Sequence, residues 1–322
     1  PKLQALDGVE IVSICNRSHE SSERVSQQFG IPTIYDKWWE LAAAPDTNAI
    51  VIGTWPYLHC PATLAALAAD KHVMCEARMA MNASEAAAML EAARAHPHLV
   101  TQIVPSPMTL KVDKAIKRLV SQGYVGNILA VEVRAGNAFL ESEAPLHWRQ
   151  DFDLSGFNVM SLGIWYEALM RWVGEATRVM AMGKTFIKIR PNPQTGSMKA
   201  VRIPEHINVI ADMACGAQAH FSISTVTGLA GPDEVTLFGS DGTLRFSGGK
   251  LYGGQRDEPA LQEITIPPGE EGGWRVEEEF VNAIRGKEIV THTTFEDGVK
   301  YMQFTEAVAR SMAQGVAVSL PL

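Results

Sequence analysis

Cysteine is scarce in this sequence, with four residues in 322, and the four are scattered along the chain. Neither paired cysteines nor clustered histidines occur, so the ligand spacing of a metal site is absent. A chain of this length does not need a disulfide framework, and most of its cysteines fall in or beside apolar runs, where a free thiol packs as a small core residue. We therefore expect no bound metal and a reducing, cytoplasmic location.

Blocks of basic residues and long apolar runs are also missing. The 28 basic and 36 acidic residues give a net charge of −8, and no cluster of lysine and arginine provides the electrostatic footprint of a nucleic-acid binder. The apolar runs, such as residues 49–53, are far shorter than the roughly 20 residues that span a bilayer. We therefore expect a small-molecule partner, with neither nucleic acid nor membrane involved.

The first hundred residues alternate strand-like and helix-like patterns. Gly30 and Pro32 end the first helix, and strands that are apolar on both faces are typical of a parallel sheet covered by helices. The pattern predicts an α/β, Rossmann-like domain over residues 1–105. Its predicted strands are 9–15, 49–53, 71–75 and 99–104, and its predicted helices are 18–29, 61–69 and 83–95.

From about residue 128 the pattern changes to short strands separated by turns, such as Ser240-Asp241-Gly242. This change predicts a second, α+β domain over residues 106–322 with a large and mainly antiparallel sheet. A single hydrophobic core stops growing at roughly 250–300 residues, which also favours two domains. The predicted strands are 128–134, 217–224, 234–238 and 243–246, and the predicted helices are 157–173, 276–285 and 295–314.

Four segments resemble the Gfo/Idh/MocA family, which includes glucose–fructose oxidoreductase and inositol dehydrogenase. They are residues 48–59 (NAIVIGTWPYLH), 71–80 (KHVMCEARMA), 280–286 (FVNAIRG) and 297–311. The resemblance covers nearly the whole chain. It implies an NAD(P)-linked enzyme that acts on a sugar, polyol or related hydroxylated molecule. It also implies a homodimer or homotetramer formed through the open faces of the second sheet.

Two features depart from this family. The family opens with a strand and a glycine-rich turn that cradles the cofactor pyrophosphate, whereas residues 1–6 resemble the end of the helix that follows. We expect the missing part in the gene product, and a true truncation is the alternative. The family's catalytic Lys, Asp and His correspond to Ala77, Ser161 and Trp165. Because alanine and tryptophan cannot accept a proton in that role, we expect the usual chemistry to be absent or reassigned.

Cofactor-binding residues are expected just after the strands of the first domain. In the family, the position of Asn16-Arg17-Ser18 selects the adenosine ribose, and an arginine there suits a 2′-phosphate, which slightly favours NADP over NAD. The alternative is a helix cap at Ser18 with a solvated Arg17. The following strands have their carboxyl ends at the edge where parallel sheets bind ligands. Further candidates there are Thr54, Trp55, Pro56, His59 and Glu76.

The segment His147-Trp148-Arg149 lies before the predicted helix 157–173, here called the altered helix because Ser161 and Trp165 stand at the family's Asp and His positions. The resemblance places the wall of the substrate cleft in this segment. We expect His147 to act in acid–base catalysis and Trp148 and Arg149 to bind substrate, the alternative being a structural or exposed histidine. Arg78 replaces the family's proline and is expected to bind a substrate carboxylate or to pair with Glu76. Glu76 is itself a candidate general base, or a cap of its loop.

On the altered helix, Ser161, Trp165 and Tyr166 share a face, with Glu167 one step round. Ser161 and Trp165 are expected to contact substrate. Tyr166 and Glu167 are the nearest replacements for the lost proton-transfer histidine. A buried aromatic helix face is an equally strong interpretation of the same pattern.

Three functions stay open at this point. The first is an oxidoreductase that uses substitute proton-transfer residues. The second is a lyase, hydrolase or isomerase of the same fold, which uses the cofactor transiently or not at all. The third is a non-catalytic protein that senses a dinucleotide. Fold alone does not choose among them.

Overall fold

The computed structural model describes all of residues 1–322, and the chain divides into two compact units. Unit 1 contains residues 1–80, 84–105 and 275–299, and unit 2 contains residues 81–83, 106–274 and 300–322. The return of residues 275–299 to unit 1 was not foreseen when residues 106–322 were predicted as one domain. No helix combines the length and the apolar character needed to cross a membrane.

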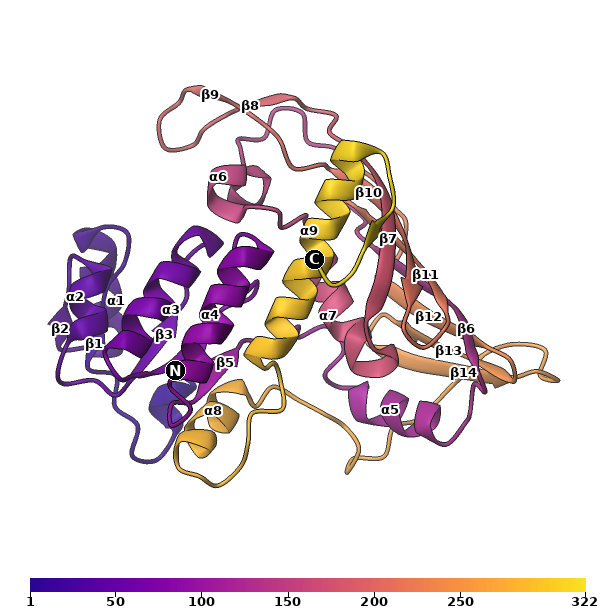
Figure 1. Ribbon diagram of the computed structural model, residues 1–322, viewed down its shortest axis with the longest axis horizontal. Coiled ribbons are helices and arrows are strands. Elements are labelled where there is room, and N and C mark those ends of the chain that lie inside the picture. Colours follow the sequence, from indigo (N-terminus) through magenta and orange to yellow (C-terminus); the bar gives the residue numbers. More distant parts are fainter. The chain divides into compact units, whose positions relative to one another are not determined.

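Unit 1 is built on parallel strands, as the sequence predicts. Strands β1 (Ser13–Ile14) and β2 (Thr33–Ile34) form one pair, and β3 (Ala49–Ile52), β4 (His72–Cys75) and β5 (Thr101–Ile103) form a separate parallel sheet. Helices alternate with these strands along the chain (Figure 1). They are α1 (His19–Phe29), α2 (Trp38–Ala43), α3 (His59–Ala68) and α4 (Ala83–Ala95), with short 3-10 turns η1 (Leu3–Ala5) and η2 (Pro56–Leu58). Unit 1 also contains α8 (Val276–Ile284), which comes much later in the chain.

The start and end of α1 show why the sequence folds this way. The Ser18 hydroxyl accepts the Ser21 N–H at 3.2 Å, and Gly30 takes the left-handed conformation, φ 67°, that ends the helix. The strands bury Val73, Cys75 and Ile103 completely. Parallel strands place their carboxyl ends at one edge, so the segments after β1, β3 and β4 are the positions from which ligand-binding side chains can project.

Unit 2 contains a nine-stranded sheet in which only β6 and β11 are parallel neighbours. The strand order is β15-β14-β13-β12-β6-β11-β10-β7-β16, which confirms the predicted, mainly antiparallel sheet. The strands are β6 (Ile128–Ala135), β7 (Ala176–Lys184), β10 (His206–Met213), β11 (Gln218–Ser224), β12 (Glu234–Gly239), β13 (Gly242–Ser247), β14 (Lys250–Gln255), β15 (Gln262–Glu263) and β16 (Val318–Ser319).

A small hairpin, β8 (Ile189–Pro191) with β9 (Met198–Ala200), stands apart from this sheet. The helices are α5 (Asp113–Ser121), α6 (Phe152–Ser155), α7 (Leu162–Val173) and α9 (Phe295–Gln314), with the 3-10 turn η3 (Trp148–Gln150). Helices α7 and α9 lie beside one face of the sheet (Figure 1), where Tyr166 stacks on Phe304 with ring centroids 3.6 Å apart. The opposite face exposes Met180, Met182 and Ile210, as alternating strands with one covered face require.

Candidate functional site

In unit 1 the side chains that follow β1 and β3 come together. The guanidinium of Arg17 lies 5.4 Å from the ring centroid of Trp55, within the range of a cation–π contact. Asn16 and Ser18 have other partners, because the Asn16 amide donates to the Ser21 carbonyl at 3.2 Å and Ser18 caps α1. Arg17 is therefore the residue of this segment that is available to a ligand. A free guanidinium beside an indole ring fits the phosphate and adenine of a dinucleotide.

His59 does not face a ligand, although the sequence suggested cofactor binding. The ring is completely buried, with Nδ1 2.9 Å from the Arg78 carbonyl oxygen and Nε2 2.9 Å from the Thr54 carbonyl oxygen. Burial lowers the pKa of His59. Both contacts are to backbone, one after β3 and one after β4, so His59 ties together the two loops at this edge. The Thr54 hydroxyl donates to the Trp55 carbonyl at 3.2 Å, and Pro56 begins η2.

Glu76 directly follows β4 and has an exposed carboxylate that accepts the Ala77 N–H at 3.2 Å. Partial desolvation raises the pKa of Glu76 and the nearby carboxylate of Glu277 raises it further, while the Ala77 N–H acts in the opposite direction. A carboxylate with a raised pKa is a stronger base than an ordinary one. Arg78, in contrast, has only 2% of its surface exposed.

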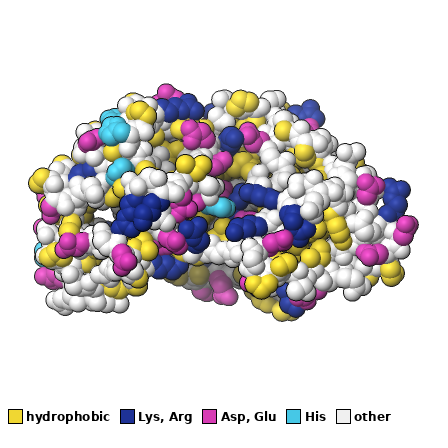
Figure 2. Space-filling view, turned by 90° about the horizontal axis from the view of Figure 1, so that it is seen from below, with side chains coloured by type: hydrophobic (Ala, Val, Ile, Leu, Met, Phe, Trp, Pro, Cys, Tyr) yellow, Lys and Arg dark blue, Asp and Glu magenta, His cyan; other side chains and the backbone are white.

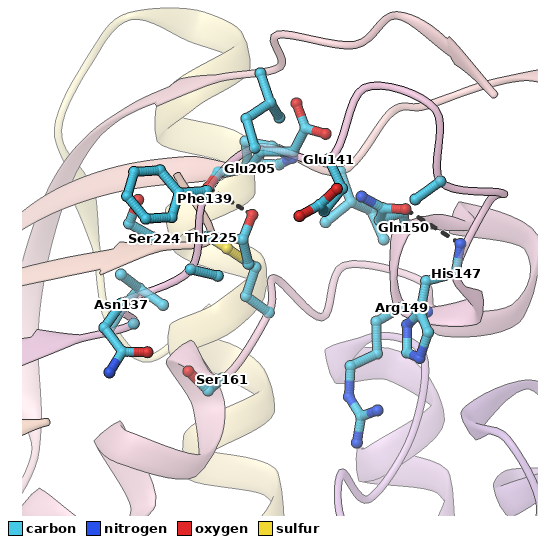
Figure 3. A pocket seen from close by; sticks show the side chains of 18 of the residues that line it. Asn137, Phe139, Glu141, His147, Arg149, Gln150, Ser161, Glu205, Ser224 and Thr225 are labelled. Carbon is cyan, nitrogen blue, oxygen red and sulfur yellow. Dashed lines mark hydrogen bonds between the residues drawn. The ribbon is translucent and has the colours of Figure 1, made fainter. Parts of the chain in front are cut away.

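Unit 2 contains a cavity of about 650 Å³, a size typical of small-molecule sites. Apolar side chains such as Phe139, Ile164 and Ile203 form part of its wall. Figure 3 shows polar side chains of this wall, which come from the loop after β6, from the turn at η3, from the residues just before α7 and β10, and from the end of β11. The polar side chains labelled there are Asn137, Glu141, His147, Arg149, Gln150, Ser161, Glu205, Ser224 and Thr225, and Arg190 and Asp233 also line the cavity.

The turn that carries His147 and Arg149 is held by its own side chains. The Gln150 Oε1 accepts the His147 N–H at 3.1 Å, drawn as a dashed line in Figure 3, and the Arg149 N–H donates to Nδ1 of His147 at 3.2 Å. Because Nδ1 accepts, a neutral His147 carries its proton on Nε2 and is a donor there. Desolvation and the adjacent Arg149 both lower the pKa of His147, which favours this neutral ring.

The altered helix does not bring its proton-transfer candidates to the cavity. Tyr166 and Trp165 are each 1% exposed, the Tyr166 hydroxyl accepts the Ala176 N–H at 2.8 Å, and burial raises its pKa. The Glu167 carboxylate accepts the Ser106 N–H at 2.6 Å and pairs with Arg171 at 3.1 Å. These three side chains form part of the core, which corrects their predicted roles. Ser161 alone of the four lines the cavity.

Sequence reasoning missed Asn137, Phe139 and Glu141, which follow β6, and Thr225, which follows β11. The pairing of β6 with β11 is parallel, so both strands end at the same edge. The sequence pattern predicted both strands but not their direction. A prediction of their parallel pairing would have indicated this cavity.

Comparison with known proteins identifies the family of both parts of the chain. Residues 1–103 match the family model described as "Oxidoreductase family, NAD-binding Rossmann fold", and residues 114–245 match the model described as "GFO/IDH/MocA C-terminal domain". The chain belongs to the Gfo/Idh/MocA family, which confirms the resemblance found in the sequence.

Among curated relatives, trans-1,2-dihydrobenzene-1,2-diol dehydrogenase of Oryctolagus cuniculus is 31% identical over 165 residues, which is 51% of this chain and 49% of the relative. Glucose-fructose oxidoreductase domain-containing protein 1 of Mus musculus is 25% identical, over 81% of this chain and 66% of the relative. The chain thus spans between about half and two thirds of the length of these relatives.

Solved structures share the fold along almost the whole chain. Levoglucosan dehydrogenase, in complex with NADH and L-sorbose, superposes with a TM-score of 0.85 at 20% identity, covering 97% of this chain and 90% of the other. An oxidoreductase domain protein from Kribbella flavida gives 0.83 at 22% identity, covering 97% and 91%. At these identities the likeness is one of fold.

Proposed function

We propose that this protein is an NAD(P)-linked oxidoreductase that oxidises or reduces a sugar, a polyol or a related hydroxylated small molecule with proton-transfer residues of its own. The observation that carries the proposal is the unit 2 cavity, with apolar and polar walls, in a chain of an NAD-binding oxidoreductase family. The names of relatives that act on a dihydrodiol and on levoglucosan support the same class of substrate.

The cavity offers separate surfaces for the two kinds of group on such a molecule. Asn137, Gln150 and Ser161 present amide and hydroxyl groups that bind hydroxyls, while Phe139 and Ile164 can contact the apolar face of a ring. Such a combination of a mainly apolar wall and a few polar groups fixes the orientation of a ligand.

Proton transfer requires a group other than Ala77 or the buried Trp165, which stand where the resemblance places the family's lysine and histidine. We infer that Glu76 is the general base that unit 1 supplies, because its carboxylate is exposed and its pKa is raised. A bound nicotinamide cofactor supplies the hydride acceptor. His147 orients the substrate through Nε2–H.

Arg17 supports a preference for NADP, since its guanidinium can pair with a 2′-phosphate. The exposed Met180, Met182 and Ile210 on the open sheet face support a homodimer or homotetramer. The buried free thiols of Cys60 and Cys75 support a reducing, cytoplasmic location.

The proposal is tested by titrating the protein with NADH and with NADPH, using energy transfer from tryptophan to the nicotinamide. Candidate polyols and sugars are then tested with the oxidised form of the cofactor that binds. Net accumulation of reduced cofactor, lost in Glu76→Gln, supports the proposal. Turnover of substrate without net reduction of the cofactor favours the lyase or isomerase alternative. The substitution of the family's catalytic residues is the observation that favours this alternative. Binding of the cofactor without any turnover favours a dinucleotide sensor.

A further inference from the structure

Arg149 differs from Arg190, the other arginine that lines the unit 2 cavity, and from nearby cationic side chains of unit 2, because it has no acidic partner. Arg190 pairs with Glu205 at 2.8 Å, Lys199 pairs with Asp151 at 2.7 Å, and Arg202 pairs with Asp153 at 2.9 Å. Acidic and basic side chains are also interspersed over the face drawn in Figure 2. An arginine that lines a cavity and lacks such a partner is therefore a specific feature of this site.

The position of Arg149 keeps its charge available. Its Cζ lies 4.1 Å from the ring centroid of Trp148, so the indole supports one face of the guanidinium and leaves its N–H groups free to bind a ligand. The acidic residues of the cavity do not neutralise it: Glu205 is bound to Arg190, and Asp233 accepts the Gly136 N–H at 2.8 Å. Figure 3 shows the guanidinium directed away from Glu141 and Glu205.

His147 adds a second donor to the same cluster. Its ring centroid lies 5.7 Å from that of Trp148, and its Nδ1 is occupied by the Arg149 N–H. The neutral ring therefore presents an N–H at Nε2 and no lone pair. A guanidinium and an imidazole N–H that line one cavity form a set of donors, which suits an oxyanion better than a neutral hydroxyl.

We propose that the ligand of this cavity carries an oxyanion, a carboxylate or a phosphate, which Arg149 and His147 bind. The inference rests on the proposed function only in taking the cavity as the substrate site. It narrows the substrate class from hydroxylated molecules in general to hydroxy acids or phosphorylated sugars. The volume of about 650 Å³ accommodates a molecule of this size together with water.

The test uses three ligands of similar size, D-gluconate, D-glucose 6-phosphate and neutral D-glucose, in calorimetric titrations of the full chain without cofactor. Protection of His147 from diethyl pyrocarbonate, mapped by mass spectrometry, reports occupancy of the cavity directly. The variants are Arg149→Met and Arg149→Lys. The matched control is Arg178→Met, which removes an exposed arginine of β7 that is paired with Asp212 of β10.

We expect one of the two anions to bind at least tenfold more tightly than glucose and to protect His147. Arg149→Met should weaken that binding at least tenfold, Arg149→Lys should weaken it less, and Arg178→Met should leave it unchanged. Binding of gluconate alone assigns a carboxylate, and binding of the phosphate alone assigns a phosphate. Equal binding of glucose, or anion binding unaffected by Arg149→Met, overturns the inference.

Failure of the inference is distinguishable from failure of the proposed function. Anion binding at Arg149 without any cofactor reduction would leave the inference standing and reject the redox function. Oxidation of a neutral polyol at the same rate in Arg149→Met would do the reverse.

Discussion

Arg190→Met is expected to cause a large loss of stability in unit 2. Arg190 and Glu205 form a buried ion pair in which the side chains are only 3% and 2% exposed. The other guanidinium nitrogen donates to the carbonyl oxygens of Glu141 and Ala144, at 2.7 and 2.8 Å. The pair thus joins the hairpin β8–β9 to the loop that lines the cavity.

The magnitude follows from what the substitution leaves behind. Methionine keeps most of the volume of the side chain, so the main effect is a buried Glu205 carboxylate without its cation and two carbonyl groups without a donor. Breaking one side of a buried pair costs about 3–5 kcal/mol. For a unit of this size, about 2–4 °C of melting temperature corresponds to 1 kcal/mol, so we expect a decrease of about 6–20 °C.

Thermal and urea unfolding, followed by circular dichroism, measure the effect. In the double variant Arg190→Met/Glu205→Gln the buried charge is gone and the amide oxygen still accepts the N–H groups of Phe186 and Ile187, which Glu205 binds at 2.8 and 3.0 Å. We expect the double variant to regain about 2 kcal/mol or more. The reasoning is refuted if the single variant loses less than about 1 kcal/mol, or if the double variant is less stable than the single one.

Three further predictions concern the cofactor, the proton acceptor and the cavity. Arg17→Met should raise the Kd of NADPH about tenfold or more and leave that of NADH within about twofold, because only NADPH offers a phosphate to the guanidinium; equal effects in fluorescence titrations would reject the contact. With Glu76 as the proton acceptor, kcat/KM falls at low pH as this carboxylate becomes protonated. The Glu277 carboxylate raises the pKa of Glu76, so Glu277→Gln should move the acidic limb of the kcat/KM profile to lower pH. An unmoved limb would assign the ionisation to another group. Gly228→Ala would place a Cβ 2.5 Å from the ring of Phe139, which must therefore move. Because this ring is 63% exposed, we expect the free energy of unfolding to stay within about 0.5 kcal/mol of the original, while the KM changes. An unchanged KM would show that the Phe139 ring does not contact substrate.

Much of the fold could be predicted because its signals are local. Helices at residues 83–95 and 295–314 have the predicted bounds, and Gly30 ends α1 as expected. The first strand was predicted over residues 9–15 but forms only at Ser13–Ile14. β-Branched residues favour an extended backbone, but a strand also needs a neighbouring strand to pair with, and β2 pairs only with Ser13 and Ile14. The pairing of β6 with β11 and the return of residues 275–299 depend on contacts between distant segments, which a periodic pattern does not contain.

The candidate site was harder to predict because the same residue types serve binding and packing. Ser161, Trp165, Tyr166 and Glu167 are neighbours on one helix, yet only Ser161 lines the cavity, while Trp165 packs against Phe246 with ring centroids 6.3 Å apart. Helical spacing gives the angle between side chains but not the direction of the core. The polar groups of the cavity come instead from the loop after β6 and the turn at His147, where sequence can vary without disturbing the sheet. A change of substrate on this scaffold therefore requires changes in these two segments, and restoring a histidine at position 165 would place it in the core.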